Sequence, residues 1–265
     1  MKAFSFFLFL LCFEVFASCK LSSKNHYYSL SSPVTMLLEE LKLLGQLEAI
    51  SVFHPIKDKK IKRLAGGIFL RPQVFGKSSL KKKIVFFDQS LEMRKNLSKV
   101  EDINIVEVFT RKLGAFESFN VSVEILQSFL EGCDKSIAEL RKKINIIKAQ
   151  LVKKKFNNTI LFYLGQFSSF KKDPDLLIVG DGFVEDLKSI AKLKTYPSPL
   201  EYVPWSSKIM KAIPKDSLHI AVADSVDESK FLLVEKNKFN LKFRGALSPG
   251  IRQVYLIEYL LGLEI

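Results

Sequence analysis

The chain has few of the side chains from which metal centres and nucleophilic catalytic sites are built. Its 265 residues include three histidines, three cysteines and one tryptophan. His26, His54 and His219 stand far apart, and no pair has the spacing of metal ligands. No Ser–His–Asp or Cys–His grouping follows from the residue order. We therefore expect no enzyme activity and no resident cofactor, although a site assembled by the fold stays open.

The N-terminus has the pattern of a secretory signal. A lysine at position 2 precedes an apolar run over residues 3–13, and small residues stand directly before Cys19. The run is too short to span a bilayer comfortably. We expect residues 1–19 to be a signal peptide and Cys19 to carry a lipid. An ordinary cleaved signal and a buried N-terminal helix are the alternatives.

Lipidation of Cys19 would leave Cys133 unpaired, because Cys12 belongs to the signal. We therefore expect no disulfide. Cys133 lies on the apolar stripe of a helix described below, so we expect it to fill the core as a small apolar side chain.

The chain carries a strong positive surplus. Its formal net charge is +13, which favours contact with nucleic acid, anionic lipid or an anionic ligand. The basic runs at 57–63, 81–83 and 153–155 are scattered and have no interleaved aromatic or glycine residues. Charge runs of this kind are usually solvated surface, and we expect no nucleic-acid partner.

The first half alternates apolar strand-like segments with a helix-like one. Residues are 48% hydrophobic and 26% charged, as in globular proteins. Ser32-Pro33 is a favourable helix start, and Gly45 a favourable end. The alternation predicts α/β units with mostly parallel sheets. The expected strands are 26–30, 47–54, 81–90 and 103–109.

The most regular segment lies in the middle of the chain. Apolar residues recur in steps of three or four from Ile125 to Leu151, which is the helical period. One helix over 125–151 would be about 40 Å long. Gly132 would cost such a helix about 1 kcal/mol, so a bend or break there is an alternative. We expect residues 120–156 to form a spine between a lobe at 26–119 and a lobe at 157–265.

The second half repeats the α/β theme. We expect strands at 158–165 and 217–223, a strand or a helix at 230–237, and helices at 181–194 and 247–262. Ser248 is the expected cap of the last helix, followed by Pro249. Two such lobes would have a cleft between them, and clefts bind ligands.

The order of these landmarks resembles a known family. The segments are YYSLSSPVTMLLEELKLLGQLEAISVFHP (27–55), KKKIVFFDQS (81–90), NTILFYLGQFSSF (158–170), YPSPLEYVPWSSKIMKAI (196–213) and GALSPGIRQVYLIEYLL (245–261). They are similar to segments of the periplasmic or lipoprotein substrate-binding proteins of ABC importers for iron chelates and cobalamin. The resemblance implies two α/β lobes joined by one long rigid helix.

The resemblance also implies a function and its partners. The protein would be a monomer in the periplasm or at the cell surface, held at the membrane through Cys19. It would capture a ferric siderophore, haem or cobalamin and deliver it to an importer permease. Loops at strand ends would bind the chelate: Ser32, His54, Phe69, Arg71, Phe87, Gln166, Phe167, Trp205 and Arg252.

Several of these residues have a plainer structural alternative. Trp205 offers a flat apolar face to a planar ligand, but it can equally wedge under its loop. A lone histidine such as His54 is more often a hydrogen-bonded structural residue. Arg71, Arg111 and Arg252 can bind a carboxylate in a fork, although a surface ion pair is the commoner fate of an arginine.

One feature departs from the family pattern. Members usually carry a glutamate on each lobe that docks onto the permease, and here residues 71–73 and 208–211 hold no carboxylate. Docking would then use other residues, such as Glu92 or Glu185. The alternatives are a degenerate relative acting as a surface or interaction protein, or an exported enzyme on a similar frame.

Overall fold

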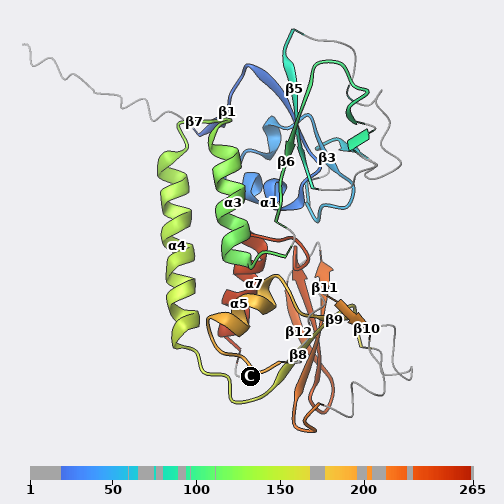
Figure 1. Cartoon of the computed structure of the whole chain (residues 1–265), viewed down its shortest axis with the longest axis vertical. Coiled ribbons are helices and arrows are strands. Elements are labelled where there is room, and N and C mark those ends of the chain that lie inside the picture. Colours follow the sequence, from blue (N-terminus) through green and yellow to red (C-terminus); the bar gives the residue numbers. More distant parts are fainter. Residues whose placement is uncertain are drawn as a thin grey trace, which may run out of the picture.

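The computed structural model describes most of the chain beyond the N-terminal segment. The described residues are 19–58, 60–64, 75, 80–88, 94–95, 97–110, 112–167, 177–195, 202–204, 213–225 and 229–263. Two sheets lie one above the other in Figure 1, and the helices run along one side of both. The expected α/β class with two lobes and mostly parallel sheets is confirmed.

The N-terminal lobe has a five-stranded, wholly parallel sheet of order β4-β3-β2-β5-β6. Its strand β5 carries the apolar run Ile84–Phe87, which is buried throughout, as expected of a parallel strand covered on both faces. Helix α1 (Ser32–Glu40) has Pro33 in its first turn and follows β2 closely. The strand bounds are β2 Asn25–Ser29, β3 Ala49–Ser51, β4 Arg63–Leu64, β5 Lys82–Phe87 and β6 Ile103–Glu107.

The C-terminal lobe has a six-stranded sheet of order β10-β9-β8-β11-β13-β12. Strands β8, β11 and β13 are parallel, and the other three add antiparallel edges. The segment at 230–237, for which strand and helix were both open, forms β12. Helices α5 (Phe183–Ser189) and α7 (Ile251–Leu261) cover this lobe. The strand bounds are β8 Ile160–Leu164, β9 Leu177–Val179, β10 Tyr202–Pro204, β11 Leu218–Ser225, β12 Lys230–Glu235 and β13 Lys238–Arg244.

The expected single helix over 125–151 is wrong, and the alternative of a break near Gly132 is confirmed. The chain forms α3 (Ala115–Gln127), a short strand β7 (Leu130–Glu131) and then α4 (Asp134–Lys153). Helix α3 ends at Gln127, and Gly132, with a left-handed φ of 68°, follows β7 where the chain turns into α4. Helices α3 and α4 lie side by side in Figure 1, and α4 alone, about 30 Å long, reaches from one lobe to the other.

A disulfide closes the end of this helical pair. Cys19 is bonded to Cys133, and the adjoining strand β1 (Lys20–Leu21) pairs with β7. The expectation of no disulfide is therefore wrong, because Cys133 is paired. A lipid thioether on Cys19 would require its sulfur to be free of this bond, and lipidation stays a prediction.

The two lobes share one apolar core on the helical side. A continuous set of buried side chains joins Leu37 of α1, Phe119 of α3, Ile147 of α4 and Ile257 of α7. Helix α7 packs against α1, α3, α4 and α5. The helices thus form one layer that braces both sheets. None of the helices in the described ranges is both long and apolar enough to cross a bilayer.

Candidate functional site

A cavity of about 580 Å³ lies between the two lobes. The N-terminal lobe contributes the segment after β3 and a residue of β4. The C-terminal lobe contributes residues from the ends of β8 and β11 and from β13. Ligands of open α/β sheets bind at the carboxyl ends of the strands, which is where this cavity is. Its lining residues are Val52, Phe53, His54, Pro55, Ile56, Arg63, Gln166, Asp224, Ser225 and Lys242.

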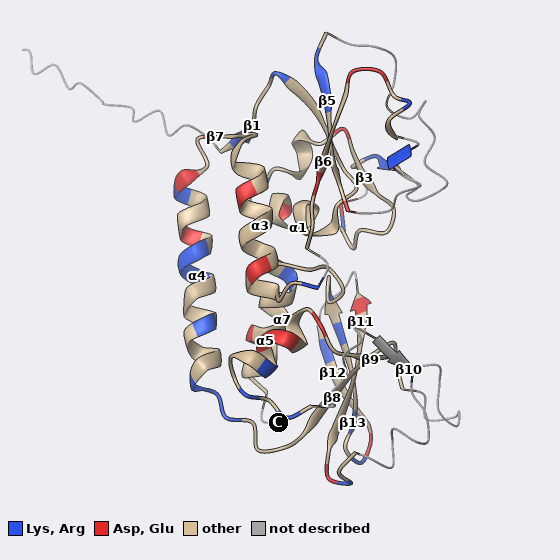
Figure 2. Ribbon diagram, viewed as in Figure 1, with Lys and Arg blue, Asp and Glu red and all other residues tan. Residues whose placement is uncertain are grey.

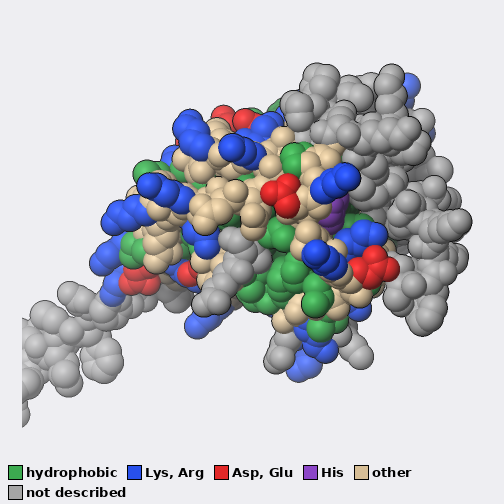
Figure 3. Space-filling view, turned by 90° about the horizontal axis from the view of Figure 1, so that it is seen from below, with side chains coloured by type: hydrophobic (Ala, Val, Ile, Leu, Met, Phe, Trp, Pro, Cys, Tyr) green, Lys and Arg blue, Asp and Glu red, His purple; other side chains and the backbone are tan. Residues whose placement is uncertain are grey.

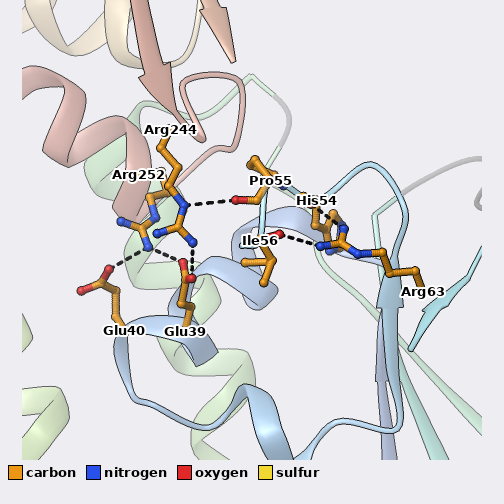
Figure 4. A network of polar contacts seen from close by, with 8 residues as sticks. All are labelled: Glu39, Glu40, His54, Pro55, Ile56, Arg63, Arg244 and Arg252. Atoms are coloured by element: carbon orange, nitrogen blue, oxygen red, sulfur yellow. Dashed lines mark hydrogen bonds and ion pairs between the residues drawn. The ribbon is translucent and has the colours of Figure 1, made fainter. Parts of the chain in front are cut away.

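Two arginines fix the cavity segment of the N-terminal lobe (Figure 4). Arg63 donates from Nη1 to the carbonyl oxygen of His54 at 3.1 Å and from Nη2 to that of Ile56 at 2.5 Å. Arg244, from the other lobe, donates from Nε to the carbonyl oxygen of Pro55 at 3.2 Å. Three successive carbonyl groups are thereby satisfied, and one of the donors ties the segment to the C-terminal lobe. The cavity wall is therefore pre-organised.

His54 is a neutral imidazole in this wall. Its side chain is 5% exposed. Burial lowers the pKa of His54 to about 4, assisted by the positive charge of Arg63 and opposed by a hydrogen bond with the backbone of Leu30. Its Nδ1 atom has no hydrogen-bond partner among the described residues. The imidazole ring of His54 is therefore uncharged at neutral pH.

The remaining wall combines apolar surface with charge. Phe53 is 75% exposed and Val52 is 43% exposed, which is unusual for large apolar side chains. Lys242 supplies a cation that pairs with no carboxylate in the described part of the chain. Asp224 accepts a hydrogen bond from the backbone N–H of Leu247 at 3.0 Å, and burial raises the pKa of this carboxyl. Such a wall suits a ligand with an apolar face and an anionic group.

An ion-pair cluster joins the lobes directly behind the cavity. It consists of Glu39 and Glu40 from α1 and of Arg244 and Arg252 from the C-terminal lobe, and we call it the interlobe cluster (Figure 4). Both arginines pair with Glu39, and Arg252 Nη2 also lies 3.0 Å from Glu40 Oε1. Tyr255 donates from Oη to Glu40 Oε2 at 3.1 Å. The four charged side chains are only 12–22% exposed, so water screens them weakly.

The structure brings some of the predicted site residues together. His54 and Gln166 both line the cavity, from opposite lobes. Ser32 and Ser248, each expected to cap a helix, instead meet across the lobes with their hydroxyl oxygens 2.6 Å apart. Arg252 belongs to the interlobe cluster, so its guanidinium is occupied by carboxylates of the protein itself.

Two predicted site residues lie in apolar cores and not at the cavity. Phe87 is 2% exposed and packs with Tyr28 and neighbouring side chains inside the N-terminal lobe. Phe167 packs edge-on against Tyr163, with the ring centroids 5.4 Å apart. These corrections have one cause. Side chains alternate between the two faces of a strand or its extension, and position along the chain does not tell which face meets the ligand.

Phe69, Arg71, Arg111 and Trp205 lie outside the described residues, as do Glu92 and the segments 71–73 and 208–211. Glu185, the other expected docking carboxylate, is on α5 and pairs with Lys188 at 2.9 Å.

The histidines do not converge. Nδ1 of His26 lies 2.8 Å from Glu48 Oε1, and Nδ1 of His219 lies 2.7 Å from the hydroxyl oxygen of Tyr163. Within the described ranges, no group of three or more His, Cys, Asp or Glu side chains is placed to hold a metal ion.

Comparison with known proteins identifies the fold. No protein-family model matches the chain, and no curated protein matches it in sequence. Solved structures do match. The periplasmic heme-binding protein HutB of Vibrio cholerae aligns with a TM-score of 0.62 at 15% identity, over 90% of this chain and 98% of that one. The heme-binding protein RhuT of Roseiflexus sp. RS-1 aligns at 0.60 and 11% identity, over 90% and 97% of the two chains. The petrobactin-binding protein YclQ of Bacillus subtilis aligns at 0.54 and 13% identity, over 76% and 72%. The chain thus has the two-lobe fold of periplasmic heme- and siderophore-binding proteins.

Proposed function

We propose that the protein is an extracytoplasmic solute-binding protein that captures a metal chelate and delivers it to an ABC importer. The observation that supports this most directly is the cavity between the lobes, with walls from both sheets at the carboxyl ends of their strands. Its volume of about 580 Å³ lies in the ordinary range for small-molecule sites. The proteins of the same fold named above bind heme or petrobactin.

The chemistry of the wall supports an anionic chelate with an apolar face. Phe53 presents an exposed ring for apolar contact, and Lys242 supplies a cation for a carboxylate or similar group. Arg63 contributes positive charge, although its donors are engaged by carbonyl groups. We propose that Phe53, Gln166 and Lys242 contact the ligand, together with Phe69, Arg71 and Trp205 from the segments outside the described residues.

We propose that the lobes move little when the ligand binds. The shared apolar core and the interlobe cluster join them on the helical side, and each would have to be disrupted in a large rotation. A ligand shifts an equilibrium between two conformations only by its difference in affinity for them. Scattering profiles with and without ligand should therefore nearly coincide, and a large domain rotation would contradict this proposal.

We propose that the mature chain is exported and keeps the Cys19–Cys133 disulfide. Disulfides persist in oxidising compartments, which agrees with the secretory pattern at 1–19. Mass spectrometry of protein from the native host decides between the two fates of Cys19. A mass two hydrogens below that of the reduced chain supports the disulfide, and a lipid adduct would overturn it.

Ligand titration tests the binding function. The protein should be purified from its native host, its visible absorption spectrum recorded, and the fluorescence of Trp205 followed during additions of haem, ferric petrobactin and cobalamin. We expect saturable quenching by one of the three. Phe53→Ala and Lys242→Gln should each weaken that binding about tenfold, because each removes one directed contact. Lys236→Gln, in the turn between β12 and β13, is the matched control. If none of the three chelates binds, the proposed function is wrong.

A further inference from the structure

Helix α4 has an outward face that its packing leaves uncovered. Its buried side chains, Ile137, Ile144, Ile147 and Leu151, all point towards the other helices. The opposite stripe is exposed and carries three lysines, one glutamate, and small, polar or apolar residues between them. Ile146 and Val152 on it are 52% and 62% exposed. The stripe, which we call the outer stripe, comprises Lys135, Ala138, Glu139, Lys142, Asn145, Ile146, Ala149, Val152 and Lys153.

The charge of this face is strongly one-sided. Six of the 20 residues of α4 are Lys or Arg and two are acidic, and Lys154 and Lys155 follow directly. Figure 2 shows α4 along the outer edge of the molecule, with blue Lys and Arg segments over its length and red acidic segments in its upper part. Figure 3 shows basic side chains gathered at the same edge, with apolar ones between them. One of the six, Lys143, is turned towards Glu258 of α7, with Nζ and Oε2 3.8 Å apart.

A groove between α3 and α4 borders the outer stripe. It holds a cavity of about 160 Å³ whose lining includes Arg141, Lys148, Asn120 and Asn145. Phe116 and Phe119 form its apolar floor, and no carboxylate lines it. This combination of two cations and two amides over an aromatic floor suits a phosphate group carried by an apolar molecule. The exposed carboxylates of α3, Glu117 and Glu124, stand three positions before and four after Asn120 on the same helix, beside the groove, and do not line the cavity.

We propose that the outer stripe and the adjoining groove hold the protein against an anionic phospholipid bilayer. Lysines with interspersed Ile and Val side chains match the chemistry of lipid head groups and the acyl boundary beneath them. A membrane-facing helix on this side leaves the cavity open, because α4 lies away from the sheets (Figure 1). Attachment by this surface acts through charge and needs no lipid on Cys19, whose sulfur is bonded to Cys133. The inference is independent of which ligand the cavity binds.

Vesicle co-sedimentation of the full, oxidised chain tests the proposal. We expect binding to vesicles that are one-third phosphatidylglycerol, none to pure phosphatidylcholine, and release as NaCl is raised. Each basic residue at an anionic surface strengthens binding about fivefold. The double variant Lys142→Glu/Lys153→Glu should therefore bind at least about 20-fold more weakly. In the groove, Arg141→Gln/Lys148→Gln should also weaken binding, whereas Lys230→Glu/Lys236→Glu on the β12–β13 hairpin should not.

Three results would overturn the proposal. The first is no binding to phosphatidylglycerol vesicles. The second is an equal loss of vesicle binding in the hairpin control. Because this control has the same net charge as the stripe variant, that result would reveal a non-specific charge effect. The third is displacement by inorganic phosphate beyond that by chloride at equal ionic strength, which would show that the groove binds free phosphate and not a membrane. Circular dichroism of each variant verifies that the fold is kept.

Discussion

The interlobe cluster offers the sharpest test of how the two lobes are held together. Glu39 is the carboxylate shared by Arg244 and Arg252, and its side chain is 18% exposed. In Glu39→Gln the two guanidinium groups keep their positions but lose the charge between them. Breaking a fully buried ion pair on one side costs about 3–5 kcal/mol. Because this cluster is partly exposed, we expect a loss of about 2–3 kcal/mol in the free energy of unfolding.

Urea unfolding of the oxidised protein measures this loss. With an m-value of about 2–3 kcal/mol per molar urea, the midpoint should fall by about 1 M. The matched control is Glu258→Gln, whose pair with Lys143 is nearly half exposed and should contribute less than about 1 kcal/mol. If Glu39→Gln destabilises the protein no more than Glu258→Gln does, the interlobe cluster does not hold the lobes together as argued here.

Three further predictions concern stability. The pKa of His54 is about 4 in the folded chain and about 6.5 in the unfolded chain. As the pH falls from 6.5 towards 4, the unfolded chain takes up a proton that the folded chain does not, so the free energy of unfolding decreases. In urea titrations at a series of pH values, the free energy of unfolding of the wild type relative to that of His54→Gln should fall by about 3 kcal/mol over that range. A relative value that does not change with pH would refute this prediction. Gly114→Ala should destabilise by about 1–3 kcal/mol, because its Cβ would lie 2.5 Å from Oδ1 of Asp186. Gly45→Ala, with no atom within 4 Å of the added Cβ, should be nearly neutral in the same thermal melts. Cys133→Ser should cost up to about 5 kcal/mol, since the disulfide closes a loop with a sequence separation of 114, and should abolish any effect of reductant on unfolding.

The sequence predicts secondary structure best where the pattern of apolar residues follows directly from how a segment is buried. The runs at 81–90 and 158–165 contain buried strands because a parallel strand covered on both faces is apolar throughout. The periodic stretch at 125–151 predicts one helix, with a break near Gly132 as the alternative, because the apolar period continues across Gly132. The chain leaves the helix after Gln127 to pair β7 with β1 beside the disulfide, and neither feature alters the spacing of apolar residues.

The residues of the site are harder to predict from the sequence, because contacts between distant parts of the chain bring them together. Asp224 and Lys242 lie in strands whose register sets which side chains face the cavity, and that register depends on a pairing across the sheet. Glu39 and Glu40 have the ordinary appearance of a solvated helix surface. Their partners are more than 200 residues away, and only the packing of α7 against α1 brings them together.

The central claim is that a chelate binds in the cavity between the lobes. Hydrogen–deuterium exchange, with and without the chelate that titrates most tightly among haem, ferric petrobactin and cobalamin, tests it most directly. We predict that the ligand slows exchange in the segments containing 52–56, 166–167 and 224–225, which line or adjoin the cavity on both lobes. Slower exchange confined to α3 and α4, or to one lobe only, would contradict the claim.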